Sequence, residues 1–399
     1  MPEEKADVVA AGSLAMDLAC DYAPEHRSHS NQMPQPATSN PAIITQSLGG
    51  VAQNVATAVH YLGTSVRLCS VVGEDAAGIA ALELLDQRGM QTAGIKQVKG
   101  GTRTSQYVAV NDTHKNLVGG MADMKILETD VIDFDKTWKL ELNLAKPKWI
   151  IVDSNWNSRA LYRWISAGKA LGAKVAFEPV SAEKCKRLLH PQSSSVDGFA
   201  AVPDNMLSLA TPNALELASM HSAAAGIGLF EREDWWRIID AMGMSSAGSR
   251  DKLVSMTNSS LVDQGVPQQS IQLLPFIPTI LTKIGSRGVL MTQLLAKDDV
   301  RLTARNSTPY ILSHSTDENG LVGGVYMRFF PPAEVVAEKD IVSVNGVGDT
   351  FLGIILAGLA KERPKEWPEL IDAAQRGSVM TLKSKESVSP ELASLRPLI

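Results

Sequence analysis

A short motif near the C-terminal end of the chain combines two glycines with an aspartate at the start of an apolar segment. It reads Gly346-Val347-Gly348-Asp349 and continues almost directly into LGIILAGLA. Glycine can adopt positive φ and lets a ligand approach the backbone. The free N–H groups at a helix start then form an anion site. A phosphoryl-transfer enzyme needs this combination, in which the amides hold the phosphate and Asp349 takes the proton of the attacking hydroxyl. The alternative is a tight loop with Asp349 as a simple helix cap.

A second glycine pair, Gly49-Gly50, precedes a helical pattern in which Asn54 lies one turn further on. The Asn54 amide and the helix-start N–H groups can hold the hydroxyls of a polyol or nucleoside. Asp17 follows the first apolar strand, at the end where open α/β sheets bind ligands, and can accept hydrogen bonds from vicinal sugar hydroxyls. The alternatives are a plain loop-to-helix junction and a turn-capping aspartate.

Two further segments have the same double interpretation. Asn213 and Glu216 stand at the cap and third position of a predicted helix, a capping box that needs no function. Alternatively, the two side chains share a helix face and organise Mg²⁺-bound water and phosphate oxygens. The turn from Lys283 through Gly285 to Gly288 either passes a nucleotide phosphate or is an ordinary turn. Neither a dinucleotide G-x-G-x-x-G fingerprint nor a P-loop is present, so a nucleotide must be held in another way.

Apolar stretches that alternate with helical patterns must position these residues. Several are apolar on both faces, which favours a mostly parallel sheet covered on both sides. The expected strands are Val8–Ala11, Val66–Val72, Tyr107–Val110, Trp149–Val152, Lys174–Phe177, Phe199–Val202, Thr279–Ile284 and Gly288–Thr292. The expected helices are residues 51–62 and 79–85, Leu161–Leu171 and Glu233–Met242.

The length of 399 residues is compatible with one decorated α/β domain, which we expect over residues 6–399. Residues 26–40 are polar and rich in Pro, Ser and Asn and predict a loop or a disordered insert. Residues 245–275 and 301–322 are polar with few strong signals, and we expect them to be surface insertions.

The composition limits the classes of function that the chain can have. Hydrophobic residues make up 44% of the chain and the formal net charge is −5, so the charge balance gives no indication of binding to nucleic acid or to an anionic membrane. The cysteines Cys20, Cys69 and Cys185 share no metal-ligand spacing, which indicates a reducing compartment. The N-terminus lacks the order of a signal peptide, and no run has transmembrane length, so the expected location is the cytoplasm.

Taken together and in this order, the motifs resemble the PfkB/ribokinase family of carbohydrate and nucleoside kinases. Within the family the chain is most similar to pseudouridine kinases. The stretches that carry this likeness are GGVAQNVA, residues 104–107, residues 122–124, residues 152–155 and residues 178–185.

The resemblance implies a three-layer α/β/α domain with a mostly parallel central sheet. It also implies a small β lid, formed by residues of about 14–48 and 100–125. It implies phosphate transfer from ATP·Mg²⁺ to a 5′-hydroxyl, with pseudouridine as the expected substrate. Ribose, adenosine and other nucleosides stay open as substrates, as does a catalytically silent nucleoside-binding regulator.

The family pattern also assigns expected roles. Asp349 is the base, and the amides of the Gly346-Val347-Gly348 turn hold the developing charge. The residues expected to bind substrate are Asp17, Gly49, Gly50, Asn54, Thr104 and Asp123. The residues expected at the nucleotide are Asn213, Lys283 and Gly285, with Glu216 binding the metal through water.

One departure concerns the monovalent-cation site of the family. Many relatives carry an acidic D-T-x before the glycine turn, whereas here Ser343-Val344-Asn345 precede it, so potassium activation is in doubt. Similar kinases pair through the lid or occur fused to a glycosidase, and a homodimer and a coupled pseudouridine-phosphate glycosidase are therefore expected partners.

Overall fold

The computed structural model describes residues 5–24, 32–189, 199–244, 248–316 and 320–399. Parts of three predicted segments lie outside these ranges, namely the start of the 26–40 loop, residues 245–247 and residues 317–319. Within the described part, no helix combines the length and apolar character needed to cross a lipid bilayer.

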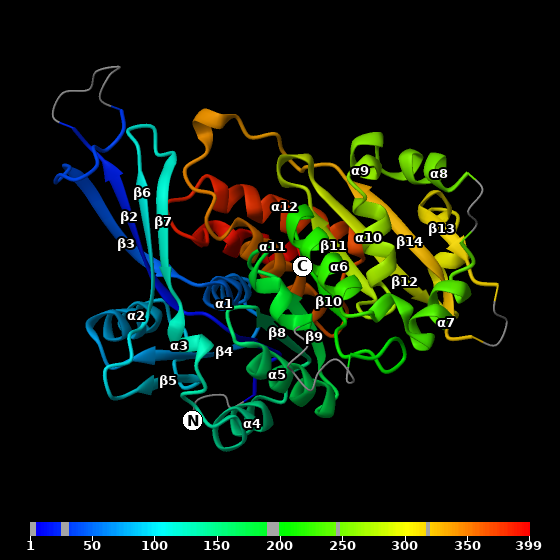
Figure 1. The fold of residues 1–399 in the computed structure, drawn as a ribbon, viewed down its shortest axis with the longest axis horizontal. Helices are drawn as coiled ribbons and strands as arrows, with labels where there is room; N and C mark the ends of the chain where they lie inside the picture. Colours follow the sequence, from blue (N-terminus) through cyan, green and yellow to red (C-terminus); the bar gives the residue numbers. More distant parts are fainter. Residues whose placement is uncertain (1–4, 25–31, 190–198, 245–247, 317–319) are drawn as a thin grey trace.

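A ten-stranded sheet forms the centre of the molecule (Figure 1). Neighbouring strands are parallel from β5 through β11 and antiparallel beyond β11. In spatial order the strands are β13 (Ile311–His314), β14 (Val322–Phe330), β12 (Val289–Ala296), β11 (Thr279–Lys283), β10 (Leu209–Ala210), β9 (Lys174–Glu178), β8 (Trp149–Asp153), β1 (Val8–Ala11), β4 (Val66–Gly73) and β5 (Ile95–Val98). The predicted mostly parallel α/β sheet is confirmed.

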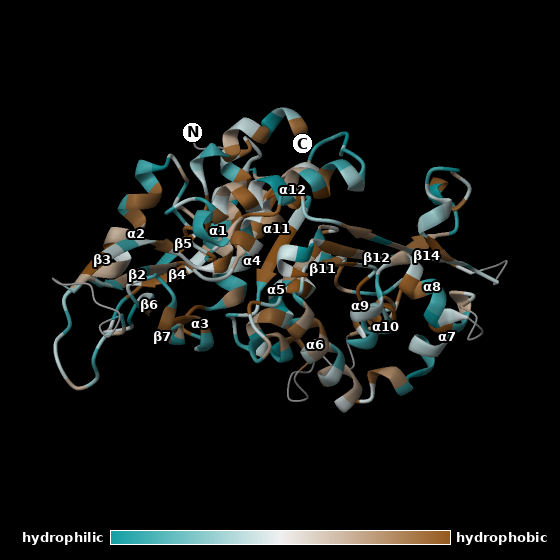
Figure 2. Cartoon of the chain, turned by 90° about the horizontal axis from the view of Figure 1, so that it is seen from above, coloured by the Kyte–Doolittle hydropathy of each residue, from teal (hydrophilic) through white to brown (hydrophobic). Residues whose placement is uncertain are grey.

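Helices cover both faces of this sheet and complete the three layers (Figure 2). One face packs against α1 (Val51–Tyr61), α2 (Ala76–Gln87), α11 (Val347–Leu359) and α12 (Trp367–Leu382). The other face packs against α3 (Lys125–Glu128), α4 (Phe134–Ala145), α5 (Ser158–Ala170), α6 (Ala214–Gly226), α7 (Glu233–Ala241), α8 (Ser249–Met256), α9 (Ser259–Asp263) and α10 (Val266–Leu273). Successive residues of a strand serve opposite layers, because side chains alternate across a sheet. In β1, Val8 joins one core cluster and Val9 the other.

A separate four-stranded sheet stands at one end of the large sheet (Figure 1). Its order is β3 (Ala42–Gly49), β2 (Ala15–Tyr22), β6 (Ser105–Asn111) and β7 (Leu117–Asp123). These strands lie in the segments that the family resemblance assigned to a lid. Two strand ends of this sheet lie near the core and carry candidate site residues. Strand β2, which contains Asp17, begins just after β1, and β3 ends with Gly49 at the turn into α1.

The structure corrects three sequence predictions. Phe199–Val202 is not a strand, because it forms no ladder with a neighbouring strand. Its backbone N–H groups donate elsewhere, from Ala201 to Asp234 Oδ2 at 3.0 Å and from Val202 to Pro275 O at 2.8 Å, and its apolar character reflects burial of Phe199. The short strand β10 takes that place in the sheet. Residues 248–275, predicted as a polar surface segment, hold α8, α9 and α10, which contribute Leu253, Leu261 and Ile271 to the core. Residues 301–322 contain β13, the edge strand beside β14.

Candidate active site

The glycine turn before α11 forms one wall of the candidate site. Gly346 caps the helix with φ of +73°, a left-handed conformation that favours glycine. A Cβ at this position would also lie 1.8 Å from Ser387 O. Both observations require glycine, and the turn places Asp349 in the first turn of α11, where the N–H groups lack intrahelical partners. The predicted anion site therefore has the expected backbone geometry.

Lys283, at the end of β11, brings a positive charge to this turn. A Cβ on Gly348 would lie 3.1 Å from Lys283 Nζ, so the ammonium group lies against the turn backbone. Lys283 Nζ also forms an ion pair with Glu178 Oε1 at 2.9 Å. Burial alone would lower the pKa of Lys283, but the carboxylates of Glu178 and Glu216 outweigh it and raise this pKa. Lys283 is therefore a permanent cation beside the amides that start α11.

Asn54 from α1 holds the carboxylate of Asp349. Asn54 Nδ2 donates to Asp349 Oδ2 at 2.8 Å, across 295 positions of sequence. Burial raises the pKa of Asp349 to about 6, although the Asn54 hydrogen bond and Lys283 act in the opposite direction. A carboxylate with such a pKa is a stronger base than an ordinary aspartate and is still largely ionised at neutral pH. The arrangement suits Asp349 to accepting a proton.

Asp17, in β2, lies beside Gly49 and close to Asp349. A Cβ on Gly49 would lie 2.2 Å from the Asp17 carboxylate, so glycine leaves the space that this carboxylate fills. Burial and the negative charge of Asp349 raise the pKa of Asp17 to about 6. Gly50 has φ of +95°, and a Cβ there would lie 2.5 Å from Ser13 O. The structure thus brings together Asp17, the glycine pair, Asn54 and Asp349.

Asn213 and Glu216 form the capping box that their spacing predicted. The Asn213 side chain accepts from Glu216 N at 2.9 Å, and Glu216 Oε2 accepts from Asn213 N at 2.8 Å. The box lies beside Lys283, since Asn213 pairs with Lys283 in an isolated parallel bridge. Glu216 is buried, and its charge contributes to raising the pKa of Asp349. The capping role is observed, and it still leaves the second carboxylate oxygen of Glu216 for another ligand.

Two residues predicted to bind substrate have other partners in the structure. The Thr104 hydroxyl accepts from Gly73 N at 2.9 Å and donates to Asp75 at 2.5 Å, while its backbone N–H also donates to Asp75, the cap of α2. Asp123 forms an exposed ion pair with Arg103 at 2.7 Å. Among the described contacts, no hydrogen bond or ion pair joins either residue to the Asp349 cluster. Gly285 begins the turn after β11, with φ of +58° and open space around it.

Two buried carboxylates were missed as site residues. Asp153, at the end of β8, accepts from Ser13 N at 2.8 Å, from Ser13 Oγ at 2.9 Å and from Ala52 N at 3.1 Å. It therefore fixes the loop after β1 to the start of α1, the helix that carries Asn54. Glu178, at the end of β9, accepts from Lys283 and from the Thr211 hydroxyl. The available signal was a lone acidic residue directly after each apolar strand.

The side chains available as metal ligands decide which mode of metal binding fits this site. Within the described residues, no group of three or more His, Cys, Asp or Glu side chains is arranged to hold a metal ion. Mg²⁺ usually keeps several waters and takes one or two carboxylates together with substrate phosphates. Glu216 beside Lys283 and the α11 amides fits that mode of binding, in which a phosphate supplies further ligands.

Comparisons with known proteins identify the family of the chain. The model of the pfkB family of carbohydrate kinases matches residues 5–224, more than half of the chain. The pseudouridine-metabolizing bifunctional protein of Schizosaccharomyces pombe is 29% identical over 395 residues, which cover 98% of this chain and 48% of that protein. The chain thus spans about half the length of this relative. The pseudouridine kinase of Escherichia coli is 26% identical over 291 residues, covering 73% of this chain and 83% of that protein.

Solved structures show the same fold. Arabidopsis thaliana ribokinase complexed with ribose and ATP superposes with a TM-score of 0.63 at 14% identity, covering 98% of both chains. Ribokinase from Cryptococcus neoformans in complex with ADP has a TM-score of 0.59 at 16% identity, covering 98% of this chain and 99% of that chain. The ribokinase-like α/β/α architecture expected from the sequence is confirmed.

Proposed function

The chain belongs to the pfkB family of carbohydrate kinases, and we propose that it transfers a phosphoryl group from ATP to the 5′-hydroxyl of pseudouridine. The observation that carries the proposal is the Asp349 carboxylate, held by Asn54 beside the α11 amides and close to Lys283. Its pKa of about 6 suits a base that works near neutral pH. The pseudouridine-acting relatives from Schizosaccharomyces pombe and Escherichia coli support the choice of nucleoside.

In the proposed reaction, Asp349 orients the 5′-hydroxyl and accepts its proton as the oxygen attacks phosphorus. Phosphoryl transfer passes through a loose transition state, so positioning and charge stabilisation supply most of the catalysis. The N–H groups of the Gly346–Gly348 turn and the Lys283 ammonium lie where charge develops on the transferred group. Asn54 holds Asp349 in place by its 2.8 Å hydrogen bond.

We propose that Asp17 and the Gly49-Gly50 turn bind the ribose hydroxyls. Asp17 lies beside the turn and near Asp349, so a sugar held there presents its 5′ end to the base. The four-stranded sheet rises from this point and acts as the lid over the substrate. Thr104 holds the Asp75 cap and Asp123 pairs with Arg103, so on this proposal both position the lid and do not contact the substrate.

The cofactors are ATP and Mg²⁺ on this proposal. Asn213, Lys283 and Gly285 would contact the nucleotide phosphates, and Glu216 would hold the metal through water. The bound metal would neutralise charge on the phosphates. Potassium activation stays in doubt, because Ser343 stands where relatives carry the acidic residue, and its Oγ accepts locally from Asn345 N at 3.2 Å.

Two protein partners belong to the proposal. Exposed apolar side chains on the lid support pairing of two chains there, since Ile43 and Ile44 are each 64% exposed and Met121 is 72% exposed. A pseudouridine-phosphate glycosidase, fused or separate, is the second partner. The bifunctional name of the Schizosaccharomyces pombe relative and its greater length support this.

One assay tests the reaction and the substrate together. ADP release is measured with pseudouridine, uridine, adenosine and ribose side by side. We expect the highest kcat/KM with pseudouridine. Faster turnover of another substrate would reassign the kinase to that substrate. Binding of pseudouridine by calorimetry without any ADP release would identify a silent regulator and overturn the proposed reaction.

A further inference from the structure

Two loops beside the candidate site have no role in the reaction proposed above. They follow β8, which ends at Asp153, and β9, which ends at Glu178. The carboxylate of Asp153 contributes to raising the pKa of Asp349, and Asp349 contributes to raising the pKa of Glu178. Both loops therefore begin within electrostatic range of the proposed base.

Lys184, which follows the loop after β9, turns its ammonium group towards the loop after β8. Its Nζ donates to Asn155 Oδ1 at 2.6 Å. Within the described part of the chain, this is its one hydrogen bond and no carboxylate lies within ion-pair distance, whereas Lys186 and Arg187 each pair with a glutamate. An ammonium group has three N–H donors, so two donors of Lys184 are left for a ligand.

The charge of Lys184 is also poorly compensated by its surroundings. The side chain is half-buried, and burial lowers its pKa. The positive charge of Arg187 acts in the same direction, and the carboxylates of Asp153 and Glu128 only partly offset these two effects. A buried charge is costly unless it is paired and hydrogen-bonded, so an oxygen atom of a ligand would stabilise this ammonium group.

Asn155 connects Lys184 to the turn that we propose for ribose binding. Asn155 is only 2% exposed. Its Nδ2 donates to Ser13 Oγ at 2.9 Å, and the same oxygen accepts from Val51 N at 2.8 Å, directly after the glycine pair. Its backbone N–H donates to Asp153 Oδ1 at 2.9 Å. The ammonium group is therefore separated from the glycine turn by only two side chains.

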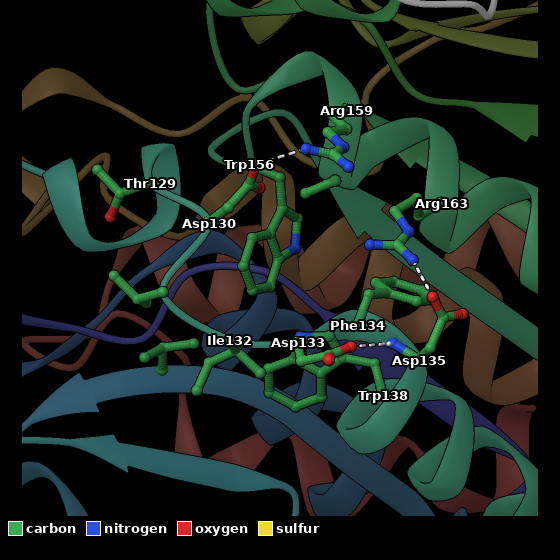
Figure 3. A pocket seen from close by; sticks show the side chains of 13 residues that line it. Thr129, Asp130, Ile132, Asp133, Phe134, Asp135, Trp138, Trp156, Arg159 and Arg163 are labelled. Carbon is green, nitrogen blue, oxygen red and sulfur yellow. Dashed lines mark hydrogen bonds and ion pairs between the residues drawn. The ribbon is translucent and has the colours of Figure 1, made fainter.

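The loop that carries Asn155 is held from both sides. Arg187 Nη1 donates to Asn155 O at 3.0 Å. On the other side, Trp156 lies in the wall of the cavity between the starts of α4 and α5 (Figure 3). Its ring centroid is 6.1 Å from that of Trp138 and 6.2 Å from that of Trp164. Asn155 is thus fixed in position before any ligand binds.

The loop after β9 is strained where it approaches Lys184. Val180 has φ of +66°, a conformation that β-branched residues rarely adopt. Such strain persists only where neighbouring contacts enforce it. Here Ser154 Oγ donates to Pro179 O, and Ser154 N donates to Glu178 O at 3.1 Å. The strained turn carries the chain from the carboxyl end of β9 to the lysine.

We propose, on the basis of the nucleoside kinase function proposed above, that Lys184 donates a hydrogen bond to a carbonyl oxygen of the nucleobase. Asn155 is the positioning residue, which holds the ammonium group through its amide oxygen. Because an ammonium group only donates hydrogen bonds, it favours a base with a carbonyl oxygen at this edge over adenine, whose exocyclic group is itself a donor. Pseudouridine and uridine carry carbonyl groups at the same places around the glycosidic bond. Lys184 therefore selects the uracil type of base and does not distinguish these two isomers.

Titration calorimetry with two ligands tests the contact. Pseudouridine is the first, and the second is a phenyl C-riboside, which has the same sugar and ring size without any carbonyl group. Lys184→Met should weaken pseudouridine binding about tenfold or more, the loss expected for a hydrogen bond from a charged donor. Its affinity for the phenyl riboside should stay unchanged, which also shows that the variant is folded. Lys186→Met is the matched control and should change neither affinity, because Lys186 is exposed and paired with Glu183.

The possible results separate this contact from the proposed reaction. Unchanged pseudouridine affinity in Lys184→Met, or an equal loss for both ligands, would overturn the contact, since an equal loss indicates a structural role. Either result leaves the kinase function in place as long as the wild type binds and phosphorylates pseudouridine. Failure of the wild type to bind pseudouridine would overturn the proposed function and the contact together.

Discussion

Replacement of Asp349 by asparagine is expected to remove most of the activity while making the folded protein more stable at alkaline pH. The two effects have one cause, since the structure keeps an ionised carboxylate in a partly buried site beside other carboxylates. Burial raises the pKa of Asp349 from 3.8 to about 6. A carboxyl group with a raised pKa favours the folded state below its unfolded pKa, and that contribution is lost as pH rises through the folded pKa.

The size of the stability effect follows from this shift. A difference of about two pKa units at about 1.36 kcal/mol each gives an upper bound of about 3 kcal/mol. Asp349 keeps some contact with solvent, and its hydrogen bond from Asn54 changes in the variant. We therefore expect Asp349→Asn to raise the free energy of unfolding by about 1–3 kcal/mol at about pH 8. The gain should shrink as pH falls through 6 and vanish below 3.8.

The effect on turnover is larger and opposite. Loss of a general base typically lowers the rate by about 10²–10⁴, or roughly 3–5 kcal/mol in activation free energy. In the wild type, kcat/KM should fall as pH drops through about 6, because the base becomes protonated. Substrate affinity of the variant should change little.

Urea unfolding at several pH values and steady-state ADP release check both effects. Exposed Asp251 offers a matched control, and Asp251→Asn should change neither quantity. Turnover close to that of the wild type would remove Asp349 from the chemistry. Equal stability of wild type and variant at about pH 8 would show that its carboxylate is not desolvated in the folded protein.

Three further predictions concern the groups around Asp349. Asp17→Ala should weaken nucleoside binding more than it lowers kcat, and unchanged affinity in titration calorimetry would contradict a role in binding. Asn54→Ala removes a hydrogen bond that lowers the pKa of Asp349, so the acidic limb of the pH–rate profile should move to higher pH; a limb that stays in place or moves down would refute this. Gly49→Ala puts a methyl group 2.2 Å from the Asp17 carboxylate and should reduce affinity for the nucleoside, whereas Gly119→Ala, with nothing within 4 Å, should not. Equal affinity of the two glycine variants would mean that the Asp17 carboxylate can move away freely.

Strand and helix patterns of the central layers were predictable because their periodicity is local. The strand Val8–Ala11 was predicted with its observed bounds, and α1 ends within one residue of the expected position. The helices of residues 248–275 were not predicted. Most are short, and one begins after Gly248 and another after Gly265, so the segment has the turn signals of a loop although Leu253 and Leu261 are buried. Tertiary packing, which composition does not encode, makes them helical.

The site was predictable where glycine spacing and an acidic residue share one segment, as at Asp349. It was less predictable where partners are distant in sequence. Asp153 and Ser13 are separated by 140 positions, and no local pattern indicates that they meet. Thr104 was assigned to the substrate through the family resemblance, yet the structure uses its hydroxyl to hold the Asp75 cap. A motif thus identifies which residues matter more readily than it identifies what each one contacts.

The raised pKa values of Asp17, Glu178 and Asp349 have burial as their first cause and neighbouring negative charge as another. Such a cluster opposes folding, and Lys283 compensates only part of it. The two apolar core clusters, one on each face of the sheet, offset this electrostatic cost to folding, since both contain many fully buried side chains. Natural sequences keep buried polar groups of this kind chiefly where function needs them. The electrostatic strain at the carboxyl ends of β9 and β11 and the start of α11 is therefore itself an argument that this region carries the chemistry.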